Sequence, residues 1–184
     1  MTLFQRLSRS VLFEGTRLSH YLDRVRMPSG RVIEAYHRLE IPDAVGCLIL
    51  NDKGEILLIE SYRYPSDSVE WEFPAGLVDP GETNLQAVER EALEESGYQT
   101  TDHKRLLSFL PITGISGHMF HAYTCRAVEK VANPDPNEVR STKWFSAEEL
   151  RTMIFDGCIR DGITITALLL HLSASDGSGE NGAG

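Results

Sequence analysis

The chain has 184 residues, of which 41% are hydrophobic and 24% charged, an ordinary composition for a soluble globular protein that argues against the disordered and membrane classes. Its formal net charge of −9 argues against nucleic acid as the main partner, because binding nucleic acid needs clustered Lys and Arg. No apolar run approaches the roughly 20 residues that span a bilayer, so we expect no membrane segment.

Cysteine usage and the N-terminus both favour a cytoplasmic protein. Cys47, Cys125 and Cys158 are odd in number, far apart and without a CxxC pair, which argues against a disulfide framework or a zinc site. The first two lie in apolar runs and are expected to be small buried hydrophobes. The N-terminus alternates apolar and basic residues and lacks the continuous apolar stretch of a secretory signal.

The N-terminal half reads as β-structure. Residues 21–41 predict an isolated β-hairpin turning at Pro28-Ser29-Gly30, which is marginal alone and must pack on other structure or on a second subunit. A second hairpin is predicted from Val45–Leu50 and Ile56–Ile59, joined by Asn51-Asp52-Lys53-Gly54. Trp71–Phe73 reads as a short strand before a loop from Ala75 to Gly81.

The C-terminal half mixes helices and strands. Thr83–Ser96 predicts a helix that stops at Gly97, and Ser146 with Glu149 forms a capping box at the start of another. The remaining elements are three strands and a final helix: Arg105–Leu110, Met119–Ala127, Val139–Phe145 and Thr164–Leu172. Residues 173–184 read as a disordered polar tail. The order predicts a mixed α/β sandwich with helices on either side of a mostly β core.

The helix Thr83–Ser96 carries acidic residues at unfavourable spacings. Leu85, Val88 and Ala92 form its predicted apolar stripe, and Glu91, Glu94 and Glu95 gather beside that stripe. Like charges three or four residues apart cost a few tenths of a kcal/mol per pair, and the helix dipole disfavours Glu in the last turn. Only Arg90 offers local compensation. Such conflicts are typical of functional sites, and three converging carboxylates suit a hard divalent cation.

A second interpretation is a solvated face of an acidic protein. The surrounding sequence decides between the two. The stretch from Gly76 to Tyr98, GLVDPGETNLQAVEREALEESGY, resembles the signature of the Nudix hydrolases: Gly, five residues, Glu, seven residues, Arg-Glu, an aliphatic, any residue, Glu-Glu, any residue, Gly. The matching positions are Gly76, Glu82, Arg90, Glu91, Glu94, Glu95 and Gly97. Ala92 stands for the aliphatic residue, and Tyr98 replaces the usual final Leu, Ile or Val.

The resemblance implies a Nudix fold, an α/β/α sandwich with a mixed sheet, here with an N-terminal β-hairpin extension. It also implies dependence on Mg²⁺ or Mn²⁺. Glu91, Glu95 and the Ala75 carbonyl would be metal ligands, and Glu94 a further ligand or a base. Arg90 belongs to the same catalytic motif and, with Glu82, would mainly hold loop and helix together.

Outside this motif, the chain resembles the branch that cleaves ADP-ribose and nucleotide sugars. The matching pieces are Ser61–Tyr64, Trp71–Gly76, the helix start after Phe145, and Gly157–Asp161. The resemblance implies domains at 1–41, for a dimerising extension, and at 42–172, for the Nudix domain. It makes Arg63 a candidate phosphate ligand and Glu72 a candidate nucleotide contact; alternatively Arg63 pairs with a helix carboxylate and Glu72 is a sheet-edge residue.

One loop departs from the branch pattern. Thr113 stands where the branch has a proline, and His118 where it has a glutamate that helps to activate water. His118 is a candidate base, a candidate ligand of substrate phosphate, or a residue without either role. Glu138 is another carboxylate that could reach the site.

The expected function is metal-dependent hydrolysis of the diphosphate of ADP-ribose or a nucleoside-diphosphate sugar, giving a nucleoside monophosphate and a sugar phosphate. Two alternatives stay open: a nucleotide-sugar binding module without turnover, and an enzyme that removes pyrophosphate from nucleoside triphosphates. We expect a small-molecule substrate, no nucleic-acid or membrane partner, and a homodimer.

Overall fold

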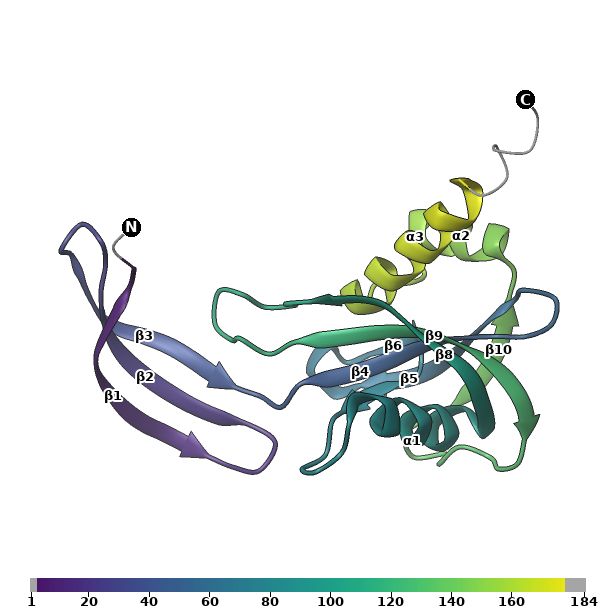
Figure 1. Ribbon diagram of the computed structural model, residues 1–184, viewed down its shortest axis with the longest axis horizontal. Coiled ribbons are helices and arrows are strands. Elements are labelled where there is room, and N and C mark those ends of the chain that lie inside the picture. The colour runs from purple at the N-terminus through teal and green to yellow at the C-terminus, as the bar shows by residue number, and fades with distance from the viewer. Residues whose placement is uncertain (1–2, 178–184) are drawn as a thin grey trace. The chain divides into compact units, whose positions relative to one another are not determined.

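The computed structural model describes residues 3–177, which form two compact units (Figure 1). Unit 1 consists of the chain up to Asp43 together with Leu110–Met119, and unit 2 of the remainder. The predicted domain boundary at residues 41 and 42 lies beside Asp43, whereas Leu110–Met119, placed in the second domain by sequence, groups with unit 1. None of the described helices has the length and apolar character needed to cross a bilayer.

Unit 1 is built on a three-stranded antiparallel sheet in the order β1-β2-β3. β2 (Ser19–Arg26) and β3 (Val32–Glu40) confirm the predicted hairpin. β1 (Gln5–Glu14) adds a strand that the sequence prediction missed. Most residues of β1 are exposed, and the strand is held by its pairing with β2.

Arg9 ties the three strands of unit 1 together. Its Nε and Nη2 donate to the buried Asp23 at 2.7 and 2.9 Å, and its Nη1 donates to Glu40 at 3.0 Å. The guanidinium also lies 4.3 Å from the ring centroid of Tyr21. Hydrogen bonds from Arg9 lower the pKa of Asp23, so this carboxylate stays ionised although it is buried.

Unit 2 contains a seven-stranded mixed sheet. Its main path runs β10-β5-β4-β9-β8, with β6 paired to β5 and β7 paired to β4. β4 and β9 are parallel and all other pairs are antiparallel. The strands are β4 (Ala44–Leu50), β5 (Ile56–Arg63), β6 (Ser68–Glu72), β7 (Ala75–Leu77), β8 (Tyr98–Phe109), β9 (Phe120–Lys130) and β10 (Ser141–Phe145). β7 falls in a stretch that was predicted as loop, and a one-turn 3-10 helix, η1 (Tyr64–Ser66), joins β5 to β6.

Three helices cover this sheet, α1 (Asn84–Ser96) on one face and α2 (Ala147–Phe155) and α3 (Gly162–Gly177) on the other (Figure 1). Thr83 and Ser146 close capping boxes at the starts of α1 and α2, as predicted for Ser146. α1 ends at Gly97, whose φ of 78° is the left-handed conformation that favours glycine.

Two helices differ in detail from their predictions. Leu85 is 44% exposed and Ala87 takes its place in the core, because the buried face of α1 turns toward Glu91. α3 extends to Gly177, so residues 173–177 of the predicted disordered tail are helical. The rest of that tail, 178–184, lies outside the described residues.

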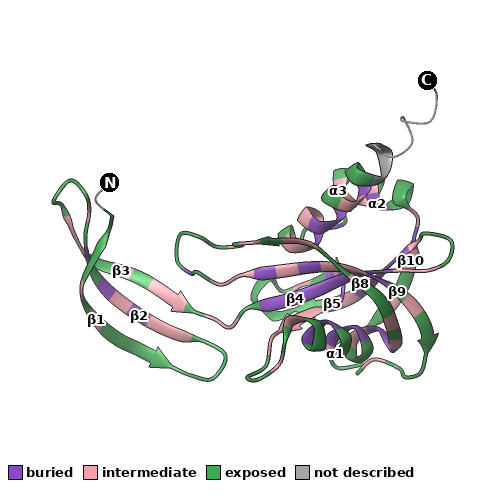
Figure 2. Cartoon of the chain, in the orientation of Figure 1, coloured by how far each residue is buried: buried purple, intermediate pink, exposed green. Residues whose placement is uncertain are grey.

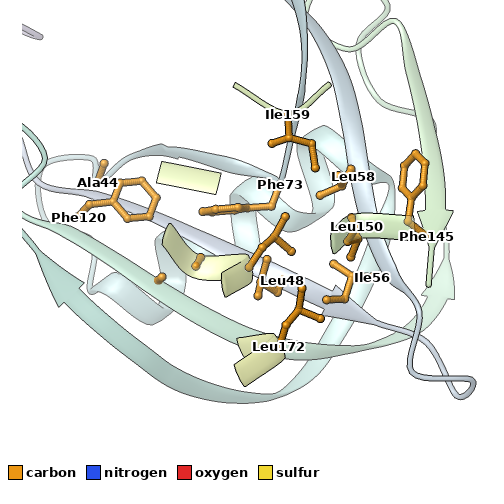
Figure 3. Close-up of a cluster of buried hydrophobic side chains, with 13 residues drawn as sticks. Ala44, Leu48, Ile56, Leu58, Phe73, Phe120, Phe145, Leu150, Ile159 and Leu172 are labelled. Carbon is orange, nitrogen blue, oxygen red and sulfur yellow. The ribbon is translucent and has the colours of Figure 1, made fainter. Parts of the chain in front are cut away.

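The sheet separates two apolar cores, and β4 contributes to both. Val45, Cys47 and Ile49 point to the core under α1, while Ala44 and Leu48 point to the core under α2 and α3. Figure 2 shows the buried colour along β4 and on the inner side of α1. Figure 3 shows the second core, where Leu48 packs among side chains from β5, α2 and α3.

Gly46 interrupts the large side chains of β4. A Cβ at this position would lie 2.1 Å from the Phe73 ring and 2.8 Å from the Ala75 side chain. The missing side chain therefore makes room for Phe73, a fully buried residue of the second core.

Candidate active site

The acidic side chains of α1 differ sharply in their exposure. Glu91 is 9% exposed and Glu95 is partly buried, whereas the side chain of Glu94 is 57% exposed. Burying carboxylates is unfavourable unless they find donors or cations. The face of the helix that packs on the sheet thus carries two carboxylates where apolar residues would be more stable.

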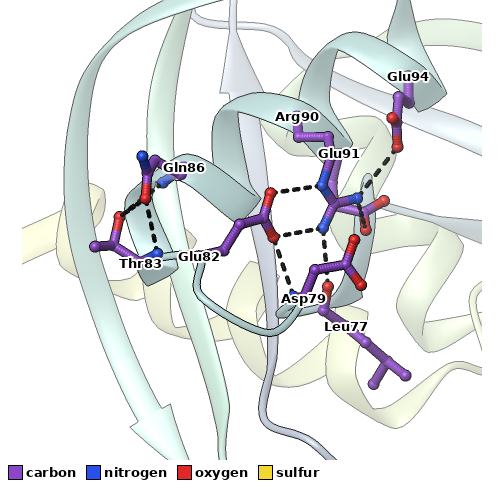
Figure 4. A network of polar contacts seen from close by, with 8 residues as sticks. All are labelled: Leu77, Asp79, Glu82, Thr83, Gln86, Arg90, Glu91 and Glu94. Carbon is purple, nitrogen blue, oxygen red and sulfur yellow. Dashed lines mark hydrogen bonds and ion pairs between the residues drawn. The ribbon is translucent and has the colours of Figure 1, made fainter. Parts of the chain in front are cut away.

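Arg90 is the centre of a polar network around these carboxylates (Figure 4). It binds Glu82 through two hydrogen bonds of 2.8 and 2.9 Å, and its Nη2 also donates to the Leu77 carbonyl at 3.0 Å. Its Nη1 donates to Glu91 at 2.6 Å and to Glu94 at 3.2 Å. Hydrogen bonds from Arg90 and from the Asp79 N–H lower the pKa of Glu82 to about 2. The loop before α1 is therefore fastened to the helix by Arg90 and Glu82, as predicted.

Gly76 on β7 lies directly against the carboxylate of Glu91. A Cβ at residue 76 would come 2.0 Å from Oε1 and 2.3 Å from Cδ of that side chain. The sequence motif contains this glycine at a fixed position, but the spacing alone does not reveal that its role is to leave space for a carboxylate.

Glu95 contacts the first residue of β7, where its Oε2 accepts a hydrogen bond of 2.8 Å from the Ala75 N–H. Burial raises the pKa of Glu95 to about 8, with a further increase from the charge of Glu91, although the Ala75 N–H and Arg63 act in the opposite direction. Burial also raises the pKa of Glu91 against the effect of Arg90, and the exposed Glu138 adds to this increase. The site therefore buries carboxyl groups whose ionised forms its donors do not fully compensate.

The donor set suits a divalent cation, because hard cations prefer carboxylate oxygens and would supply the missing positive charge. Within residues 3–177, however, no three His, Cys, Asp or Glu side chains are gathered closely enough to hold a metal ion. Arg90 attracts Glu91 and Glu94, while the Ala75 N–H holds Glu95. A cation would therefore replace some of these contacts.

Arg63 and Glu72 lie beside this acidic cluster. Arg63 Nε donates to both carboxylate oxygens of Glu72, at 2.8 and 3.1 Å, and Nη2 makes a further short contact. Arg63 thus pairs with Glu72 and not with a carboxylate of α1, although the charge of Glu95 helps to raise its pKa, after the larger effect of Glu72. Glu72 is buried at the end of β6.

His118 belongs to unit 1. Its Nδ1 lies 2.6 Å from the Pro42 carbonyl oxygen, and its backbone N–H donates to Ser116 Oγ at 3.1 Å. In the same loop, the N–H of Met119 donates to Asp43 at 2.9 Å. These contacts fix the histidine within unit 1, and its three candidate roles remain predictions.

Comparisons with known proteins relate the sheet and the acidic helix α1 to a protein family. Residues 40–164 match the model of the NUDIX domain. The chain is 30% identical, over 144 residues, to CMP-5'-(N-acetyl-N-hydroxy-3-aminopropyl)phosphonate hydrolase of Streptomyces rubellomurinus, covering 78% of this chain and 67% of that protein. It is 27% identical, over 170 residues, to an ADP-ribose pyrophosphatase of Mycobacterium tuberculosis, covering 90% and 82%.

A solved structure, the crystal structure of an ADP compounds hydrolase, shares the fold with a TM-score of 0.85 over 97% of both chains, at 19% identity. The family match covers the seven-stranded sheet, α1, α2 and the start of α3, including Glu82 and the carboxylates of α1. With this match and the Gly76-to-Gly97 motif in place on β7 and α1, the chain belongs to the Nudix family and is a Nudix hydrolase.

Proposed function

We propose that the protein hydrolyses the diphosphate of ADP-ribose or of a nucleoside-diphosphate sugar in a reaction that depends on Mg²⁺ or Mn²⁺. The observation that carries this proposal is a pair of carboxylates one turn apart on the sheet-facing side of α1, the buried Glu91 and the partly buried Glu95, both with raised pKa values. A diphosphate substrate is itself an anion, so a cation between it and the protein satisfies both sides. The similarity to an ADP-ribose pyrophosphatase of Mycobacterium tuberculosis supports this substrate class.

Glu91, Glu95 and the carbonyl of Ala75 would hold the cation. When bound, it would neutralise the phosphate oxygens and stabilise the charge that develops on them. Arg90 keeps Glu91 and Glu94 in reach of one another. Gly76 leaves Glu91 the space that it needs against β7.

In the reaction, the oxygen of water forms a bond to one phosphorus, and the bond from that phosphorus to the bridging oxygen breaks. We assign to Glu94 the role of accepting the proton from water, because it is exposed and held by a single 3.2 Å hydrogen bond from Arg90. The bridging oxygen leaves on the other phosphate. The products are a nucleoside monophosphate and a sugar phosphate.

Substrate recognition is assigned to Arg63 for a phosphate and to Glu72 for the nucleotide. Arg63 uses Nε and Nη2 for Glu72, which leaves Nη1 to donate to an anion. For His118 we keep the role of a phosphate ligand as a proposal. A homodimer is also proposed, because β1 leaves Val11, Leu12 and Phe13 more than half exposed, which is unusual for a monomer.

The test is a panel of ADP-ribose, nucleoside-diphosphate sugars and nucleoside triphosphates, incubated with Mg²⁺ and analysed by product. Release of a nucleoside monophosphate and a sugar phosphate supports the proposal, and Glu94→Gln and Glu95→Gln should each abolish most of it. Glu89→Gln is the matched control, since Glu89 is an exposed carboxylate of the same helix. Release of pyrophosphate from triphosphates alone, or binding without turnover by folded protein, contradicts it.

A further inference from the structure

A second arginine is held on β6 in the same way as Arg63. Arg160, in the segment before α3, donates through Nε to Glu70 at 3.2 Å, and its Nη2 makes a short contact with the same carboxylate. Arg63 binds Glu72 through the same two nitrogens. In both pairs the glutamate is 7% exposed and the arginine side chain about half exposed. Each glutamate is thus a buried anchor for an arginine that is accessible to solvent.

The two anchors share one face of the strand. Glu70 and Glu72 are two residues apart on β6, where side chains alternate between faces, and both are buried. Their α-carbons are separated by about 6.5 Å, the rise of two strand residues. Each arginine keeps Nη1 unused in the contacts described, so two guanidinium groups with spare donors are anchored along one short strand.

Asp161 connects the Arg160 segment to the site. Its carboxylate caps α3 by accepting a 2.7 Å hydrogen bond from the Thr164 N–H, and Thr164 Oγ1 in turn lies 3.4 Å from the N–H of Phe73. The charges of Glu95 and Asp161 both contribute to the raised pKa of Arg63, after Glu72. Arg63 is thus near enough to Glu95 on α1 and to Asp161, the residue after Arg160, to be influenced by both charges.

We propose that Arg160 is a second phosphate-binding residue of this site, which acts with Arg63 on the anionic substrate and is oriented by Glu70. The inference rests on the proposed diphosphate substrate and adds a residue to its recognition. A guanidinium fixed by a carboxylate loses little freedom when it binds an anion, because it is already oriented. The alternative is that the ion pair between Arg160 and Glu70 serves only to hold the segment before α3 against β6.

The experiment compares Arg160→Gln and Arg160→Lys with Arg126→Gln. Arg126 is the matched control because its side chain is also 60% exposed and pairs with a carboxylate, Asp52, at 3.6 Å. Calorimetry measures binding of a methylene-bridged, non-hydrolysable analogue of ADP-ribose in Mg²⁺. Turnover of the hydrolysable substrates is measured separately, and thermal denaturation reports folding.

We expect Arg160→Gln to weaken analogue binding about tenfold and to raise KM with little change in kcat, since it removes a charged hydrogen bond. Arg160→Lys should restore part of the affinity, and Arg126→Gln should bind as the wild type does. A lower melting temperature with unchanged affinity overturns the proposal, as does a wild-type protein that does not bind the analogue. If the wild type binds but hydrolyses nothing, the proposed hydrolysis fails while the comparison of affinities still decides the role of Arg160.

Discussion

The carboxylate of Glu91 lies against the α-carbon of Gly76, so closely that a Cβ there would be 2.0 Å from Oε1. A helix and a short strand therefore meet through a charged side chain, in a place where most proteins pack apolar groups. Gly76→Ala should displace Glu91, destabilise the fold by about 1–3 kcal/mol and lower kcat at least about tenfold. Gly114→Ala is the control, because its Cβ would meet nothing within 4 Å. Full activity of Gly76→Ala in a steady-state assay would contradict this role of the glycine.

Arg90→Gln should lower stability by about 2 kcal/mol in urea denaturation, because the carbonyl of Leu77 and the carboxylates of Glu82 and Glu91 lose their donor together. The pKa of Glu82 is held at about 2, below its ordinary value of 4.5. The stability from this pairing is present above pH 4.5 and is lost as the pH falls through 2. The acid-induced loss should therefore be smaller in Arg90→Gln than in the wild type. Equal acid dependence of the two proteins would argue against the pairing.

Glu95 should make the protein less stable as the pH rises, whereas the pairing of Glu82 makes it less stable as the pH falls. Burial raises its pKa from 4.5 to about 8, so the folded state keeps a proton that the unfolded state releases. Its contribution is present below pH 4.5 and is lost as the pH rises toward 8, by about 2 kcal/mol once partial solvent access is allowed for. Glu95→Gln should remove this part of the pH dependence. We would measure urea denaturation of both proteins between pH 5 and pH 9 without divalent metal; parallel curves would exclude the raised pKa.

Divalent metal should stabilise the protein more at high pH than at low pH, because a cation binds ionised carboxylates and competes with protons. Mg²⁺ at a hundred times its Kd should add about 2.7 kcal/mol to the free energy of unfolding. Differential scanning fluorimetry at pH 5.5 and pH 8.5 measures the effect. Glu91→Gln and Glu95→Gln should lose most of it, and Glu89→Gln should retain it. A shift of the same size in all four proteins would place the cation elsewhere.

The exposed apolar residues of β1 predict self-association through unit 1. Val11→Glu should shift the protein from dimer to monomer in size-exclusion chromatography with light scattering, because a charge would be buried in the interface. Val128→Glu is the matched control, since Val128 is a similarly exposed strand valine of unit 2. A wild type that is monomeric at micromolar concentration would disprove the proposed dimer.

The sequence predicts well those features that depend on local rules. Composition and the stop at Gly97 located α1, and the turn at Asn51–Gly54 located the hairpin of β4 and β5. β1 escaped prediction because strand pairing, and not an apolar face, stabilises it. The motif identified the carboxylates, but their partners depend on tertiary contacts. No spacing rule predicts that Arg63 pairs with Glu72. Nor does one predict that Arg160 forms the same kind of ion pair with Glu70, ninety positions away in the sequence.

Gly46 helps to set the register in which β4 pairs with β9. β4 is apolar on both faces, so sliding it by one residue against β9 would cost little in polarity, and alternation alone cannot select the correct pairing. A slipped strand would, however, push a valine or a cysteine into the Phe73 ring. Gly46, which has no side chain, thus favours the correct register of β4, because any other residue at this position would clash with Phe73.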